Sequence, residues 1–257
     1  MPTQRTQESF EEYLTVVRRL RKECPWDREQ THQSIRHSLI EEAYEVVETI
    51  DENNLNELKA ELGDLLLHVV LHAVMAEEEK EFTIDEVVLS SKEKLIRRHP
   101  HVFGNFKATD AHEVKANWEK IKMSEGRASI LQGVPKELPA LLRASRLQEK
   151  ASKVGFDWKN KKDVWKKVLE EVKELQAAER SADRAGVEDE LGDLLFSLVN
   201  YARFLHVNPE LALRRASEKF TKRFRKVEQE LHKQGKRVEH ASLEEMETLW
   251  NNNKHSG

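Results

Sequence analysis

Two acidic motifs recur in this chain as a pair, with the same spacing each time. A Glu-Glu-x-x-Glu motif at 41–45 is separated by fifteen residues from Glu-Leu-Gly-Asp at 61–64, and the same two motifs return at 170–174 and 190–193. In an α-helix, residues three or four apart lie on one face, so each motif gathers its carboxylates on one side of a helix. Each half of the chain therefore carries two acidic helix faces.

These faces are predicted to meet within each half. A short turn around residues 51–54 joins the first two acidic segments, so their helices run antiparallel and four to five carboxylates come together. Like charges so close repel one another unless a cation compensates them. A ligand set made only of carboxylates favours a hard divalent ion, Mg²⁺ or Mn²⁺, over zinc or copper. Because Mg²⁺ commonly bridges to substrate phosphates, the pattern indicates phosphate-ester or anhydride chemistry.

A solvated acidic helix face is the plainer interpretation of either motif alone. The metal-site interpretation is favoured because both motifs occur twice at fixed spacing and each pair continues directly into an apolar run, at 65–75 and 194–205. A helix that is apolar most of the way round is usually buried, so these runs are predicted to lie at the centre of their bundles.

Basic and aromatic residues accompany both acidic pairs. Pairs of cations at i, i+4 can clamp phosphate oxygens, and tryptophan offers a face on which a base can stack. A solvated basic face and ordinary interhelix packing are the alternatives. The candidates are Lys94, Arg98 and Trp118 in the first half and Lys167, Lys219, Arg223 and Trp250 in the second.

Histidines offer a competing metal site in the first half only. His68 and His72 follow Asp64 by four and eight residues, but the second copy has Ser197 and Tyr201 at those places. Chemistry common to both halves cannot depend on these histidines, so we expect buried or half-buried structural side chains.

The elements that position these residues are predicted to be helices throughout. Only 9 Gly and 6 Pro occur in 257 residues, which is too few turn formers for a sandwich, a barrel or a series of βαβ units. We therefore predict an all-α fold of two tandem homologous helical bundles. The stretch richest in Gly and Pro separates them, which gives domains at 1–123 and 139–257 with a linker at 124–138.

Local signals support helices at several places. Phe10, Tyr13, Leu14 and Val17 follow the helical period and form one apolar stripe. Capping boxes are predicted at 83–86 and 242–245, and Asn208 precedes a first-turn proline.

Charge and hydropathy exclude several classes of protein. Charged residues make up 35% of the chain but the net charge is only −4, which argues against a dedicated nucleic-acid-binding protein. The longest apolar run, at 65–76, is too short to span a bilayer, and the start lacks an apolar signal segment. Cys24 alone cannot form an intrachain disulfide. We expect a cytoplasmic protein with no membrane or nucleic-acid partner.

Taken together, the motifs resemble those of the MazG-type nucleoside triphosphate pyrophosphohydrolases in their tandem two-domain form. The resemblance rests on the two acidic motif pairs, on Cys-Pro-Trp-Asp at 24–27 and on Lys-Val-Gly-Phe-Asp-Trp at 153–158. It implies an all-α homodimer that uses Mg²⁺, with Mn²⁺ as a possible substitute, to hydrolyse nucleoside triphosphates to monophosphate and pyrophosphate with broad base specificity. Removal of aberrant nucleotides or control of a signalling nucleotide is the implied purpose.

The resemblance also implies roles for individual residues. Metal ligands would be Glu171, Glu174, Glu190 and Asp193 in the second half and Glu42, Glu45, Glu61 and Asp64 in the first. Nucleotide contacts would come from Lys167, Lys219, Arg223 and Trp250, and Glu170 and Glu41 are candidates to orient or deprotonate the attacking water. Lys219 and Arg223 would also neutralise the charge that develops on the leaving group.

The first half departs from this pattern at one position. Where the second half has Lys167, the first has Ser38, so one phosphate contact is missing there. The departure agrees with catalysis in the C-terminal half, although every carboxylate is present in the first half and should bind metal.

Three other functions share parts of this pattern. A regulatory protein that binds nucleotides without hydrolysing them would have the same carboxylates. A ferritin-like di-metal oxidase would need Glu-x-x-His motifs, which neither half offers at the matching place. Nucleic-acid binding through the basic segment 219–236 is weakened by the interleaved Glu228 and Glu230.

Overall fold

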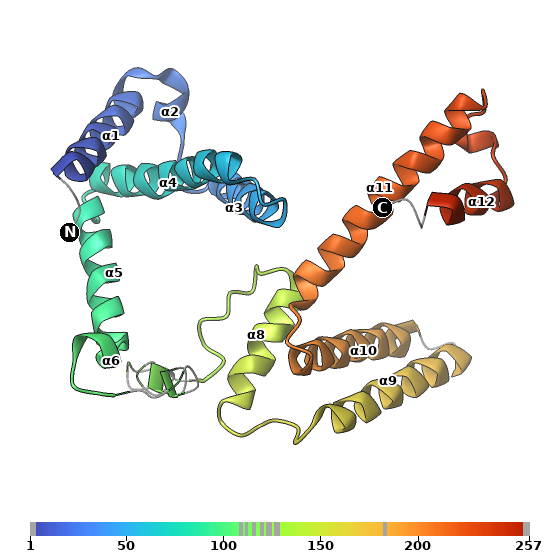
Figure 1. Ribbon diagram of the computed structural model, residues 1–257. Coiled ribbons are helices and arrows are strands. Elements are labelled where there is room, and N and C mark those ends of the chain that lie inside the picture. The colour runs from blue at the N-terminus through green and yellow to red at the C-terminus, as the bar shows by residue number, and fades with distance from the viewer. Residues whose placement is uncertain are drawn as a thin grey trace. The chain divides into compact units, whose positions relative to one another are not determined.

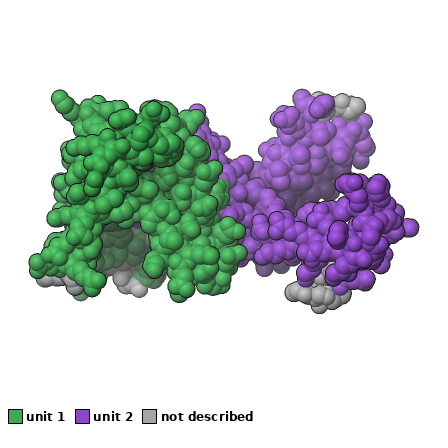
Figure 2. Space-filling view, turned by 90° about the horizontal axis from the view of Figure 1, so that it is seen from above, with its two compact units in different colours: residues 1–114 green, residues 115–257 purple. Residues whose placement is uncertain are grey.

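The computed structural model describes residues 4–107, 110, 113–114, 117–118, 121, 125, 129–181 and 184–253. Within these residues the regular elements are helices, and no strand occurs. The chain divides into two compact units, residues 1–114 and 115–257, which are coloured separately in Figure 2. The all-α fold predicted from the low Gly and Pro content is confirmed. The boundary between the units falls before the linker expected at 124–138, and part of that linker lies outside the described residues.

Unit 1 is built around one long helix (Figure 1). Its helices are α1 (Gln4–Glu23), α2 (Pro25–Glu29), α3 (Arg36–Asp51), α4 (Leu55–Glu78), α5 (Ile84–Arg98) and α6 (Pro100–Phe103). The central helix α4 packs against α1, α3 and α5. Two ion pairs join α1 to the end of α4: Arg18 with Glu77 at 3.0 Å, and Arg21 with Glu78 at 2.7 Å.

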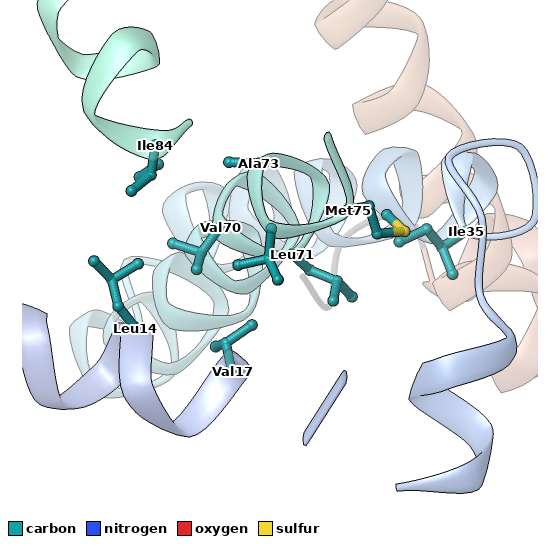
Figure 3. Packing of buried hydrophobic residues seen from close by; sticks show 9 residues of the cluster. Leu14, Val17, Ile35, Val70, Leu71, Ala73, Met75 and Ile84 are labelled. Carbon is teal, nitrogen blue, oxygen red and sulfur yellow. The ribbon is translucent and has the colours of Figure 1, made fainter. Parts of the chain in front are cut away.

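The core of unit 1 lies on the second half of α4. Val70, Leu71, Ala73 and Met75 are buried there, and Leu14, Val17, Ile35 and Ile84 pack around them from α1, the segment before α3, and α5 (Figure 3). The prediction that the apolar run at 65–75 lies at the centre of its bundle is confirmed for this part of α4.

In the described residues of unit 2, four long helices are followed by a short C-terminal pair. They are α8 (Ala140–Ser152), α9 (Lys161–Ser181), α10 (Arg184–Phe204), α11 (Pro209–Lys233), the 3₁₀ turn η1 (Val238–His240) and α12 (Leu243–Asn253). Helices α9 and α10 pack along each other, α8 lies against α10 and α11, and α12 folds back on α11.

Unit 2 leaves much apolar surface uncovered. Its buried hydrophobic side chains are Val164, Val168, Val199, Val227 and Leu231. On α10, however, Leu195, Phe196 and Leu198 are 46%, 45% and 40% exposed. The prediction that the run at 194–205 lies at the centre of its bundle is therefore wrong for the single chain, because the described helices of unit 2 cover only one side of α10.

Helix starts follow the predicted capping chemistry. Thr83 and Glu86 form a reciprocal capping box at α5, and Ser242 and Glu245 exchange the same two bonds before α12. The Asn208 side chain accepts from the amide of Leu211 at the start of α11. No helix in the described part of the chain is long and apolar enough to span a membrane.

Candidate metal centre

Each unit brings three of its predicted carboxylates together. In unit 1, Glu42 and Glu45 of α3 meet Glu61 of α4, and one oxygen of each lies within 4.8 Å of the others. In unit 2, Glu171, Glu174 and Glu190 of α9 and α10 do the same. Below, these two sets are called the unit 1 and unit 2 carboxylate groups. Their shared geometry follows from the shared spacing of the motifs, since the turn between the two helices aligns the same helical faces.

The fourth predicted carboxylate of each unit stands next to its group but outside it. Desolvation and repulsion from Glu45 raise the pKa of Glu42 and of Glu61, and Asp64 is close enough to raise both further. Asp193 lines a cavity together with Glu171. The four carboxylates expected in each site thus separate into a group of three and a neighbour.

A lysine pairs with one member of the unit 2 carboxylate group, Glu171, and with the adjacent Glu170. Nζ of Lys167 lies 2.7 Å from Oε1 of Glu170 and 2.7 Å from Oε1 of Glu171, one turn along α9. These hydrogen bonds, first with Glu170 and then with Glu171, raise the pKa of Lys167, which therefore stays charged. The pKa of Glu174 is raised by desolvation and by a hydrogen bond shared with Glu171, while Lys167 acts in the opposite direction.

The unit 1 carboxylate group has no such cation. Ser38 replaces the lysine, and among the described residues no basic side chain forms an ion pair with Glu42, Glu45 or Glu61. Desolvation raises the pKa of Glu42, and repulsion from Glu45 raises it further. The pKa of Glu61 is raised by the same two causes. Uncompensated negative charge therefore accumulates in unit 1.

The donor set of both groups fits a hard divalent cation. Such an ion takes oxygen ligands at about 2.0–2.6 Å, so its ligand oxygens lie within about 5 Å of one another. The carboxylate oxygens of each group already meet this condition without rearrangement. Desolvation and repulsion between carboxylates together raise the pKa of Glu42, Glu61 and Glu174, and a cation would relieve the repulsion.

The glycine of each Glu-Leu-Gly-Asp motif has open space beside it. A Cβ added at Gly63 or at Gly192 would meet no heavy atom within 4 Å among the described residues. Packing among the described residues therefore gives no reason for a mid-helix glycine, which costs about 1 kcal/mol relative to alanine. The open side is available to a ligand or to another protein chain.

A cavity of about 850 Å³ adjoins the unit 2 carboxylate group. Lys167, Glu171 and Asp193 line it on the side of that group, and Phe156 and Trp158 line it from the loop before α9. This volume lies in the range of small-molecule binding sites. It could therefore accept a ligand much larger than an ion.

The remaining basic and aromatic candidates of unit 2 lie elsewhere. Arg223 of α11 stacks over the ring of Trp250 of α12, with 5.9 Å from Cζ to the ring centroid, and Lys219 is exposed one turn earlier. Helix α11 runs away from the α9–α10 pair (Figure 1), and none of these three residues lines the cavity. A single chain therefore does not bring them to the carboxylate group.

The corresponding unit 1 candidates come from other elements than the carboxylates. Lys94 and Arg98 lie on α5, which packs against α4, and both are at least partly exposed. Trp118 is half-buried and falls in the second compact unit, although the sequence assigns it to the N-terminal domain.

The prediction that His68 and His72 are buried or half-buried is confirmed. His68 is 9% exposed, and Nδ1 of His72 lies 2.7 Å from Nδ1 of His32. Neither histidine joins a group of metal-ligating residues within the described structure. The His32–His72 contact was not predicted, because no sequence pattern relates the loop before α3 to the middle of α4.

Known proteins resemble this chain over most of its length. Residues 30–103 and 159–228 each match the MazG nucleotide pyrophosphohydrolase domain. The nucleoside triphosphate pyrophosphohydrolase/pyrophosphatase MazG of Thermotoga maritima is 47% identical over 94% of this chain and 94% of its own. The nucleoside triphosphate pyrophosphohydrolase of Escherichia coli K12 is 44% identical over 92% of this chain and 94% of its own. The uncharacterized protein YabN of Bacillus subtilis is 46% identical over 94% of this chain but 51% of its own.

Proposed function

The chain belongs to the MazG nucleotide pyrophosphohydrolase family, and from this premise we propose that it hydrolyses nucleoside triphosphates to nucleoside monophosphate and pyrophosphate, with Mg²⁺ as its cofactor, in unit 2. One observation carries the assignment to unit 2: Lys167 and the carboxylate group stand together at one side of a cavity large enough for a nucleotide. Unit 1 has the carboxylates without the lysine.

Glu171, Glu174 and Glu190 would hold the metal. Asp193, which lines the same cavity as Glu171, would be a further ligand. Oxygen-only ligands suit Mg²⁺, with Mn²⁺ as a possible substitute. A bound divalent cation would polarise phosphate oxygens as a Lewis acid and would reduce the negative charge of the triphosphate that the nucleophile approaches.

The protein's own residues would position the triphosphate and its attacking water. Lys167 is charged and lines the cavity, so its ammonium can bind a phosphate oxygen in place of Glu170. Glu170 is 57% exposed and, once released, is free to orient or deprotonate water. Attack at the α-phosphorus, with pyrophosphate as the leaving group, would give the two products.

Lys219, Arg223 and Trp250 would contact the nucleotide from a second copy of the chain. Two observations support this: none of the three residues lines the cavity beside the carboxylate group of its own unit, and the single chain leaves apolar surface of α10 exposed. Apolar surface that a single chain leaves exposed over several neighbouring side chains commonly marks a protein interface. The enzyme would then be a homodimer in which Lys219 and Arg223 neutralise the charge that develops on the pyrophosphate.

Unit 1 would bind a divalent cation without contributing the main activity. Glu42, Glu45, Glu61 and the adjacent Asp64 provide the ligands. The biological purpose that fits broad use of nucleotides is removal of aberrant nucleotides or control of a signalling nucleotide.

The test is product analysis. The purified protein is incubated with Mg²⁺ and a panel of ribo- and deoxynucleoside triphosphates, and products are separated by anion-exchange chromatography. Monophosphate with pyrophosphate is expected from every base. Diphosphate with orthophosphate would place the attack at the γ-phosphorus and overturn the mechanism, and tight binding without turnover would indicate a regulatory protein.

A further inference from the structure

The cavity of unit 2 holds two amide side chains whose orientations are fixed by their neighbours. Gln148 of α8 and Asn200 of α10 both line it. Each amide is bound on one side by a partner that can only accept or only donate, so the free side of each has a defined polarity. The cavity therefore offers a specific pattern of hydrogen-bonding groups, which can be compared with possible ligands.

Gln148 presents an acceptor. Its Nε2 donates to the carbonyl oxygen of Phe196 at 2.8 Å, and because a carbonyl cannot donate, the amide cannot be reversed. The side chain is 8% exposed, and its Oε1 is buried without a hydrogen-bond partner among the described residues. A buried acceptor is rarely left unsatisfied in a native protein, so an N–H donor is expected there when the site is filled.

Asn200 presents a donor. Its Oδ1 accepts from Nε and Nη2 of Arg203, at 3.1 and 2.8 Å. A guanidinium only donates, so this amide is fixed as well, and its Nδ2 has no acceptor within the described structure. Phe196 and Asn200 are one turn apart on α10, so the Gln148 acceptor and the Asn200 donor belong to the same wall of the cavity.

We infer that this wall is the base-reading subsite of the enzyme: Gln148 Oε1 accepts from an N–H of the nucleobase, and Asn200 Nδ2 donates to the ring nitrogen or carbonyl beside it. The inference rests on the proposed function for the presence of a nucleotide. Adenine, cytosine, guanine and uracil all carry an N–H donor next to an acceptor on the Watson–Crick edge. One acceptor and one donor therefore recognise the feature that the four bases share, which gives broad specificity a structural cause.

The other walls of the cavity suit the faces of a base. Phe156 and Trp158 line it and are 84% and 45% exposed, so their rings are available for stacking. Asp157, between them, is paired with Arg203, with 2.9 Å from Nη1 to Oδ2. Arg203 thus connects the loop that carries Phe156 and Trp158 to Asn200. Lys167 and Glu171 line the same cavity, so base and phosphates can be bound at once.

The test removes single groups from the ligand and from the protein. Purine riboside triphosphate lacks the N–H donor of adenine at position 6 but keeps the acceptor at position 1. Binding of its α,β-methylene analogue, which cannot be cleaved between the α- and β-phosphates, is compared with that of the same analogue of ATP by titration calorimetry. The wild-type protein is expected to bind the ATP analogue about five- to tenfold more tightly. In Gln148→Leu this preference falls to about one, whereas Gln234→Leu, an exposed change at the end of α11, keeps it.

A second variant covers the case in which Gln148→Leu does not fold. Asn200→Asp keeps an acceptor for Arg203 but removes the amide donor. Wild-type protein should prefer the ATP analogue over its 1-deaza counterpart, which lacks the ring acceptor, and Asn200→Asp should lose that preference. Equal binding of donor-bearing and donor-lacking analogues by wild type, or unchanged preferences in both variants, overturns the inference. Preferences that persist in a protein that cleaves no triphosphate would instead refute the proposed function and leave the subsite intact.

Discussion

Nζ of Lys167 lies 2.7 Å from Oε1 of Glu171, and the Glu171 side chain is only 6% exposed. A buried carboxylate is costly unless it is paired, so this lysine is what allows Glu171 to remain inside the α9–α10 pair before any metal binds. Unit 1 reaches the same carboxylate geometry with Ser38 at the equivalent place. The carboxylate groups of the two units therefore differ in whether a cation is paired with them, although both are built from two paired helices in the same way.

Replacing Lys167 should destabilise the metal-free protein. Lys167→Met leaves the buried Glu171 charge unpaired. Breaking a fully buried pair costs about 3–5 kcal/mol, but the lysine is 36% exposed, so we expect a loss of about 1–2 kcal/mol in the free energy of unfolding. Urea denaturation in the presence of a chelator measures it.

Lys166 provides the control for that experiment. It pairs with Asp163 at 3.1 Å and is 78% exposed, so Lys166→Met should change stability by less than about 0.5 kcal/mol. Equal losses in the two variants would mean that the Lys167–Glu171 pair has no special role.

Turnover should depend on the carboxylates of unit 2 and not on those of unit 1. Glu190→Gln removes one ligand charge from the unit 2 carboxylate group, and we expect turnover to fall at least about a hundredfold with unchanged helicity. Glu61→Gln is the matched change in unit 1 and should keep most of the activity. Far-UV circular dichroism checks the fold. If Glu61→Gln were the more damaging change, catalysis would have been assigned to the wrong unit.

Metal and pH should act together on stability. The pKa values of Glu42, Glu61 and Glu174 are raised above their ordinary value of 4.5. The folded metal-free protein thus binds these protons more tightly than the unfolded chain, so its stability is highest below that value and falls as pH rises through the folded pKa values. Bound Mg²⁺ removes the repulsion between the neighbouring carboxylates of each group. The increase in Tm on adding Mg²⁺ should therefore grow from about pH 5 to about pH 7.5. An increase that is the same at every pH would contradict this.

Calcium should bind without supporting catalysis. Its longer and looser oxygen coordination suits carboxylate ligands but positions phosphates less strictly than Mg²⁺ does. Tm should rise with Ca²⁺ while pyrophosphate release stays near background, and Mn²⁺ should restore turnover. Full activity in Ca²⁺ alone would be evidence against a site that requires the Mg²⁺ geometry.

The sequence predicts helices and carboxylate groups well because both depend on local spacing. Glu171 and Glu174 share a face by helical geometry, and a short turn between two helices is enough to add Glu190. Gln148 was not predicted as a functional residue, because its role depends on the contact of α8 with Phe196 of α10, 48 residues away. No periodicity or motif encodes that contact. The exposed face of α10 was misjudged for a related reason: an apolar run shows that burial is needed, but not which chain provides it.

Mixing two inactive variants can show whether a second copy of the chain completes the unit 2 site. If Lys219 and Arg223 act on the carboxylate group of a second copy, Glu190→Gln and Arg223→Ala each inactivate both sites of their own homodimer. In a heterodimer of the two variants, however, one site has an intact Glu190 and an intact Arg223. Unfolding and refolding an equal mixture produces about half heterodimers, each with one working site of two, so about a quarter of wild-type activity should return. Each variant refolded alone is the control. Activity that does not return, in a mixture that sedimentation shows to be dimeric, would mean that α11 serves the site of its own chain and moves towards α9 to do so.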